Sequence, residues 1–220
     1  MGKITLLNLA KALRREKVPV HRKTGTFMEY RLKGTSGLMH YSDMPSQIEI
    51  RPEIVQQMNK KAEQSQAMNR EISSAVNYED EKMILGANKI GDRGSCGVMF
   101  GSMGMFHTHP GVDEKEVSDT FSLMDVITCF KFQIPVMFAQ TTHNNRVWCA
   151  VKSNETESTV SKRKKVQRWE ILEGQEDENI AKGFTSDKDY RGLVKKFCDE
   201  FHIKLYCGKK GHLREYQGDW

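Results

Sequence analysis

The sequence predicts a single α/β domain of the α+β kind, in which a mixed, mostly antiparallel sheet is flanked by helices. Two patterns carry this prediction. Short runs of strand-forming residues follow one another with turn residues between them, which is typical of a strand meander. Around these runs lie longer segments in which apolar residues recur every three or four positions, the spacing of helices packed on a core. At 220 residues the chain is long enough to bury one sizeable core.

Two helices are expected before the main part of the sheet. Residues Ile4–Arg15 carry apolar side chains at helical intervals, and Pro19 ends this first helix. Residues 20–50 mix short strand-like pieces with glycine and proline, which mark turns. The second helix is predicted to run from Pro52 to about Gln66, because proline suits the first helical position, where the N–H is unpaired in any case.

The central part of the chain is expected to form most of the sheet. In order, the expected elements are strands at 69–76, 82–85 and 98–109, with turns at 77–81 and 91–94, a helix at 123–132, and a hairpin of strands at 134–139 and 146–151. The strands of this meander lead to residues 106–110, which contain the main candidate functional residues.

The last part of the chain is expected to be less regular. Ser153–Arg168 is polar, has no apolar period and contains the basic cluster Lys162–Lys165, so it is interpreted as a solvated linker or strand edge, with a docking patch for an acidic partner as the alternative. Trp169–Leu172 is predicted to be a further strand, Asp187–Phe201 a helix and Ile203–Cys207 the final strand.

Composition argues against several classes of protein. The net charge of +5 comes from basic residues scattered among nearly as many acidic ones, so a nucleic-acid partner is not expected. No apolar run approaches the length of a membrane span, and the N-terminus lacks the features of a signal peptide. Five widely spread cysteines suggest reduced thiols and a cytoplasmic location. A zinc knuckle built from the cysteines and histidines of the tail is not favoured, because no close cysteine pair starts one.

The segment Phe106–Pro110 (FHTHP) indicates a metal site. On a strand His107 and His109 share one face, because side chains alternate with a period of two. Further along, Ser122 and Asp125 are neighbours on one face of the expected helix. Two histidines and an aspartate are ordinary zinc ligands, and three protein ligands leave a fourth position open for water, as in catalytic sites.

A zinc hydrolase also needs a carboxylate near the metal to collect and pass on a proton. Glu71 is the preferred candidate for this general base, because it begins an early strand with small residues behind it. Glu49 and Glu53 are the alternatives, whereas Glu79 and Glu81 fall in an expected turn.

These residues resemble the signature of the JAMM (MPN-plus, JAB-like) zinc metalloproteases, which is a distant glutamate, then His-Ser/Thr-His-Pro, then Ser-x-x-Asp. The resemblance covers roughly residues 65–150. It implies a JAB/MPN-like core, related to the cytidine deaminase fold, with Zn2+ as cofactor. It further implies that His107, His109 and Asp125 bind the metal, that Ser122 stabilises the oxyanion and that Glu71 is the general base.

One departure from the family pattern is the longer loop between the second histidine and the serine. The segment Gly111–Thr120 is interpreted as an enlarged loop that could gate the site, and Asp119 within it is a competing ligand candidate. The resemblance also implies a division into an N-terminal extension (1–50), a metalloprotease core (51–155) and a C-terminal extension (156–220).

The activity implied by the resemblance is hydrolysis of a peptide or isopeptide bond at the C-terminus of a ubiquitin-like protein, as in deubiquitinases. The expected partner is therefore a protein substrate, with no nucleic acid and no membrane, and the oligomeric state is left open. The main alternative is a non-catalytic MPN-type scaffold that binds partner proteins. A zinc deaminase is less favoured, because the chain lacks Pro-Cys-x-x-Cys.

Overall fold

The computed structural model describes residues 4–5, 40–79, 82–99, 101, 103–111, 120–131, 134–156, 162–181 and 187–218. Their strands are β1 (Ile4–Thr5), β2 (Gln47–Glu49), β3 (Ile72–Glu79), β4 (Lys82–Leu85), β5 (Lys89–Ile90), β6 (Gly104–His109), β7 (Val136–Thr141), β8 (Val147–Lys152), β9 (Ile203–Lys209) and β10 (His212–Glu215). Their helices are α2 (Pro52–Met68), α3 (Leu123–Lys131), α4 (Lys162–Ala181) and α5 (Asp187–Glu200), with a short 3-10 turn at Tyr41–Asp43.

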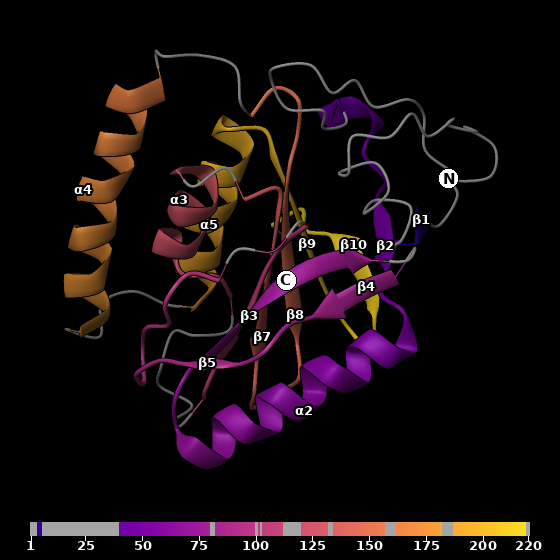
Figure 1. Cartoon of the computed structure of the whole chain (residues 1–220). Coiled ribbons are helices and arrows are strands. Elements are labelled where there is room, and N and C mark those ends of the chain that lie inside the picture. Colours follow the sequence, from indigo (N-terminus) through magenta and orange to yellow (C-terminus); the bar gives the residue numbers. More distant parts are fainter. Residues whose placement is uncertain are drawn as a thin grey trace.

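The described strands form one mixed sheet of ten strands, which is curled and mostly antiparallel (Figure 1). Its order is β1-β2-β10-β9-β8-β7-β6-β3-β4, and β5 pairs with the other end of β3. Two of the pairs, β1 with β2 and β6 with β7, are parallel. The mixed α/β class predicted from the sequence is therefore confirmed.

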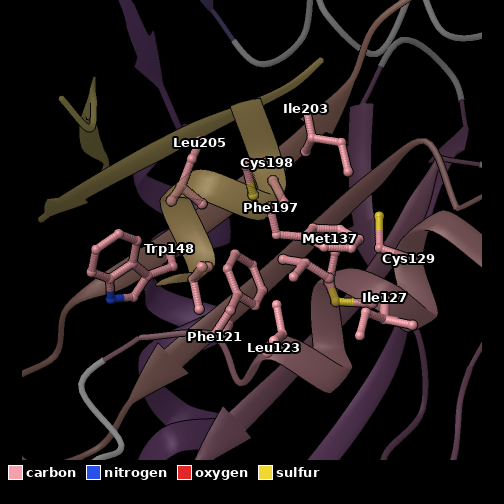
Figure 2. Close-up of a cluster of buried hydrophobic side chains, with 14 of the residues drawn as sticks. Phe121, Leu123, Ile127, Cys129, Met137, Trp148, Phe197, Cys198, Ile203 and Leu205 are labelled. Carbon is pink, nitrogen blue, oxygen red and sulfur yellow. The ribbon is translucent and has the colours of Figure 1, made fainter. Parts of the chain in front are cut away.

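Helices cover both faces of the sheet. α2 crosses one face, whereas α3 and α5 lie on the other and α4 packs outside them against α3 (Figure 1). Alternate side chains of the central strands point to opposite faces of the sheet, so each strand contributes to both hydrophobic cores. Phe106 and Phe138 belong to the core beneath α2, and Met105 and Met137 belong to the core beneath α3 and α5, part of which is drawn in Figure 2. Both β6 and β7 are buried along their whole length, and the second half of each strand carries polar side chains: His107, Thr108 and His109 in β6, and Gln140 and Thr141 in β7. None of the helices in the described ranges is both long and apolar enough to cross a bilayer.

The predictions for the middle of the chain are largely confirmed. α2, α3 and α5, strand β4 and the β7–β8 hairpin lie where they were expected. β3 begins at Ile72 and not at Asn69, because Asn69 still caps the end of α2, and it continues to Glu79, into the expected turn, because it pairs with β4 to that point. β6 begins only at Gly104, not at Val98. The described residues before it, 91–99, 101 and 103, belong to no strand, and the Gly101 N–H donates to the Gly104 carbonyl at 3.1 Å.

Three predictions near the ends of the chain are wrong. Ile4 and Thr5 form a strand rather than the start of a helix, and the rest of that proposed helix lies outside the described residues. The expected linker and strand at residues 153–172 are largely helix α4, whose buried Val166 and Trp169 are three residues apart. β9 is followed by a further strand, β10. The two are joined through Lys210 and Gly211, whose positive φ angles of 54° and 82° are typical of a tight hairpin turn.

Candidate metal centre

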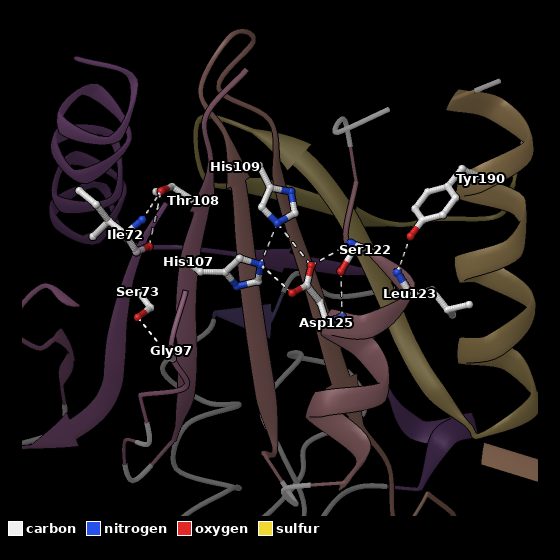
Figure 3. A network of polar contacts seen from close by, with 10 residues as sticks. All are labelled: Ile72, Ser73, Gly97, His107, Thr108, His109, Ser122, Leu123, Asp125 and Tyr190. Carbon is white, nitrogen blue, oxygen red and sulfur yellow. Dashed lines mark hydrogen bonds and ion pairs between the residues drawn. The ribbon is translucent and has the colours of Figure 1, made fainter. Parts of the chain in front are cut away.

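The two histidines of the FHTHP segment lie side by side on β6. This strand pairs with β3 on one side and β7 on the other, with Ser73 opposite His107 and Ala139 beside it. Both imidazoles point to the face covered by α3, and Thr108 between them points to the α2 side (Figure 3). His107 is fully buried and His109 is 8% exposed. The position of β6 inside the sheet therefore fixes both rings.

Asp125 reaches the histidines from the first turn of α3. Ser122 caps this helix, since its Oγ accepts from the Asp125 N–H at 3.0 Å while Asp125 Oδ2 accepts from the Ser122 N–H at 2.8 Å. This reciprocal pair is a capping box, which satisfies two N–H groups at the helix start. Tyr190 of α5 adds a third bond, because its hydroxyl oxygen accepts from the Leu123 N–H at 2.8 Å (Figure 3).

Three side chains converge between β6 and α3. Nε2 of His107 lies 2.9 Å from Nε2 of His109, and the Asp125 carboxylate lies 3.3 Å from each, through Oδ1 to His107 and Oδ2 to His109. A ring nitrogen carries at most one hydrogen, which points along one direction in the ring plane. Hydrogens on both nitrogens would bring two N–H groups face to face, and a single hydrogen between the rings would set a carboxylate oxygen against a nitrogen lone pair. The three contacts therefore cannot all be hydrogen bonds.

A cation shared by the three groups would satisfy all of these contacts. Ligand atoms of a tetrahedral zinc, at about 2.0 Å from the metal, are about 3.3 Å from one another, which is close to the separations observed. In the described part of the chain, His107, His109 and Asp125 are the one group of this kind with donor atoms close enough to hold a metal ion. The donor set suits Zn2+ and also other divalent first-row metals.

The Asp125 carboxyl is in the protonation state that binds a metal. Burial by itself raises the pKa of the Asp125 carboxyl, but the charge of His107 and the hydrogen bonds of both imidazoles outweigh burial and hold that pKa well below its usual range. Asp125 is therefore ionised at neutral pH, which is the form that binds a metal.

Glu71 lies next to the cluster, immediately before β3. If the β3–β6 register is continued from the Ser73–His107 pair, Glu71 falls opposite His109 and on the same face. The side chain is buried, and burial raises the pKa of its carboxyl. The nearby imidazoles of His109 and His107 partly offset this rise. A carboxyl with a raised pKa beside a metal site is suited to accepting and releasing a proton.

Cys96 is a neighbour of the site that the sequence pattern does not predict. Its thiol is hydrogen-bonded to Glu71, and its own pKa is raised by burial and by the charge of that carboxylate. Cys96 lies in the irregular segment between β5 and β6, where no periodicity links it to Glu71. The contact arises only from the folding of this segment against the start of β3.

The other candidate residues lie elsewhere or outside the description. Glu49 is on β2, separated from β6 in the sheet by β10, β9, β8 and β7, and it contacts His212 at 3.4 Å. Glu53 is exposed in the first turn of α2. The other end of this helix is the one near the site, because the Gln66 side chain bonds to Thr142, whose N–H donates to the His109 carbonyl. Glu53 lies about 20 Å from Gln66 along the helix. Asp119 and most of the loop 111–120 lie outside the described residues.

We compared the chain with known protein families, with curated proteins and with solved structures, and none of these comparisons found a match.

Proposed function

We propose that the chain is a zinc-dependent metallopeptidase of the JAMM type. The observation that carries the proposal is the convergence of two imidazoles and an ionised carboxylate, whose mutual contacts cannot all be hydrogen bonds. A buried glutamate with a raised pKa lies beside them. The sequence order of these groups also matches the signature that the chain resembles.

His107, His109 and Asp125 would hold the metal. Zinc bound there would supply a Lewis acid and a water of lowered pKa, with a coordination position left open by the three protein ligands. The remaining chemistry belongs to two other residues, Glu71 and Ser122.

Glu71 would take a proton from the attacking water and pass it to the leaving amine. Its raised pKa lowers the cost of holding that proton during the reaction. Ser122 would donate to the oxyanion. Its oxygen accepts from the Asp125 N–H, and that bond leaves its own hydroxyl hydrogen available to a substrate.

The substrate class follows from the resemblance alone. We propose a peptide or isopeptide bond at the C-terminus of a ubiquitin-like protein. Such a tail is extended and could add as a strand to an edge of a sheet.

Two measurements test the proposal: the zinc content of the purified protein and its rate of substrate hydrolysis. Purified protein should contain about one zinc per chain, and His109→Ala should lose it. Glu71→Gln should keep the metal and lose cleavage of a panel of ubiquitin-like conjugates. Wild-type protein without metal would contradict the metal site. A metal-loaded protein in which Glu71→Gln cleaves as fast as the wild type would contradict the role of Glu71.

A second candidate function is a non-catalytic scaffold that binds partner proteins. The capping box favours it, because Ser122 and Asp125 both have a structural role that needs no reaction. A scaffold predicts that wild type and Glu71→Gln behave alike in every hydrolysis assay while remaining folded.

A further inference from the structure

A chain of buried hydroxyls encloses the backbone on both sides of Glu71. The Ile72 N–H donates to Thr108 Oγ1 at 2.9 Å, the Thr108 hydroxyl donates to Ser65 Oγ at 2.7 Å, and the Ser65 hydroxyl donates to the Arg70 carbonyl at 2.7 Å. Each hydroxyl thus has one donor and one acceptor role filled. The chain begins and ends on the two residues that flank Glu71.

The end of α2 is also hydrogen-bonded to the segment 70–72 that contains Glu71. Asn69 adopts a left-handed conformation with a φ of 51°, which reverses the chain after the helix. This turn brings the Arg70 N–H to 3.2 Å from the Ser65 carbonyl oxygen. Ser65 therefore holds Arg70 twice, through its carbonyl and through its hydroxyl.

The opposite edge of the segment is held by the loop after β5. The Glu71 N–H donates to the Asp92 carbonyl at 2.8 Å, and the Glu71 carbonyl accepts from the Gly91 N–H at 2.9 Å. On the β6 side the backbone pairing with β3 extends only as far as Ser73 and His107. Beyond that pair the Ile72 N–H donates to the Thr108 hydroxyl oxygen and not to a backbone carbonyl of β6.

We propose that Thr108 and Ser65 are positioning residues for Glu71, an inference that rests on the proposed function. They hold residues 70–72 so that the Glu71 carboxylate stays beside His107 and His109. Thr108 is in β6 between the two histidines, but its side chain points to the opposite face, toward α2 (Figure 3). Thr108 and Ser65 are both fully buried, so they act through Glu71 and not by contact with a substrate.

The inference explains why a hydroxyl residue separates the histidines. Valine has nearly the shape of threonine and is well suited to a buried strand, but it can neither accept from the Ile72 N–H nor donate to Ser65. Serine keeps both bonds. The two substitutions at Thr108 therefore separate the shape of the side chain from its hydrogen bonding.

The test compares Thr108→Val and Thr108→Ser with a matched control, Thr156→Val. Thr156 is also fully buried and its hydroxyl donates to the His202 carbonyl at 2.7 Å, but it follows β8, which β7 separates from β6 in the sheet. Zinc content, kcat, KM and the pH profile of kcat are measured below the unfolding temperature of each variant.

Thr108→Val should keep its zinc and lose about 10- to 100-fold in kcat with little change in KM, since a small misplacement of a catalytic group has effects of this size. Its pH profile should shift relative to the wild type. Thr108→Ser should recover most of the rate, and Thr156→Val should keep it. If Thr108→Val retained the kcat of Thr156→Val, the positioning role would be overturned.

A crystal structure of zinc-loaded Thr108→Val separates this inference from the proposed function. The inference predicts that the Glu71 carboxylate moves while His107, His109 and Asp125 stay in place, whether or not the wild type hydrolyses any substrate. An unmoved Glu71 would overturn the inference. Absence of hydrolysis by the wild type would instead overturn the proposed function.

Discussion

The two halves of the candidate site differ in how far ordinary structural needs account for them. On α3, Ser122 and Asp125 form a capping box, and a helix start needs such a pair whether or not a metal binds. On β6, His107 and His109 are buried with their Nε2 atoms facing each other, an arrangement that stabilises no strand. The strand half therefore indicates function more strongly than the helix half, although Ser-x-x-Asp is as much a part of the signature.

The two halves are also supported by different parts of the molecule. β6 lies between β3 and β7, and α2 braces the neighbouring Glu71 through Ser65 and Thr108. The start of α3 is instead held by the hydroxyl of Tyr190 on α5. The strand half and the helix half of the site should therefore respond differently to substitution, and four predictions use this difference.

The largest effect is expected in the strand half. His107→Ala removes a ligand from a fully buried position, and zinc affinity should fall by at least about 100-fold, because loss of a supporting outer group alone costs 10- to 100-fold. Competition with a chromophoric chelator measures this affinity. His212→Ala, at an exposed position on β10, serves as control and should bind zinc like the wild type. Equal affinity of His107→Ala and the control would show that the histidines are not ligands.

The next effect separates the two roles of Ser122. Glycine at a helix N-cap costs only a few tenths of a kcal/mol relative to serine, whereas alanine costs about 1 kcal/mol. Ser122→Gly should therefore keep nearly the wild-type stability but lose about 100-fold in kcat, the cost of one oxyanion donor. Thermal unfolding and steady-state kinetics provide the two measurements. Full activity of Ser122→Gly would leave the serine with its capping role alone.

The sequence predicts much of this site because its residues lie on elements with a clear period. The helical repeat of α3 and the alternation along β6 place His107, His109 and Asp125 before any contact is known. The proximity of Glu71 depends on the antiparallel pairing of β3 with β6, which a meander favours.

Other features depend on contacts that sequence periodicity does not encode. Among the α4 side chains that the structure describes, the buried apolar ones are Val166 and Trp169, with Leu172 partly buried, and the many polar residues around them are typical of a linker. β10 is only four residues long and pairs with β2, which lies far away in the chain. The hydrogen bond between Cys96 and Glu71 follows from the fold of an irregular segment. Ser122 and Asp125 form a capping box, and the Ser-x-x-Asp spacing alone cannot distinguish this structural role from a catalytic one.

A smaller effect is expected when the helix half loses its support from α5. Tyr190→Phe leaves the Leu123 N–H buried without its acceptor, which costs about 1–3 kcal/mol, or roughly 2–4 °C in Tm per kcal/mol for a chain of this size. Zinc affinity should also weaken, by up to about tenfold, because Asp125 lies in the same helical turn.

The control for Tyr190→Phe is Tyr206→Phe. The buried Tyr206 hydroxyl donates to the Pro45 carbonyl at 2.8 Å, and its ring belongs to the core beneath α2. It should lower Tm without changing zinc affinity. If both variants bound zinc like the wild type, α5 would support the fold and not the site.

The smallest effect is a difference in pH dependence between Glu71 and Asp125 in chelated, metal-free protein. Burial raises the pKa of Glu71 above 4.5, so the folded state holds a proton that the unfolded state releases, and the free energy of unfolding should fall as pH rises from 4.5 through the folded pKa. The pKa of Asp125 is held well below 3.8 despite its burial, so its contribution is present above 3.8 and is lost as pH falls through the folded pKa.

Urea unfolding with chelator across these pH ranges tests both signs. Glu71→Gln should remove the loss of stability on the alkaline side, and Asp125→Asn should remove the loss on the acid side. Glu53→Gln, at an exposed position on α2, should change neither slope. If Glu71→Gln kept the wild-type slope above pH 4.5, Glu71 would not be the buried, proton-holding carboxyl that the strand half of the site requires.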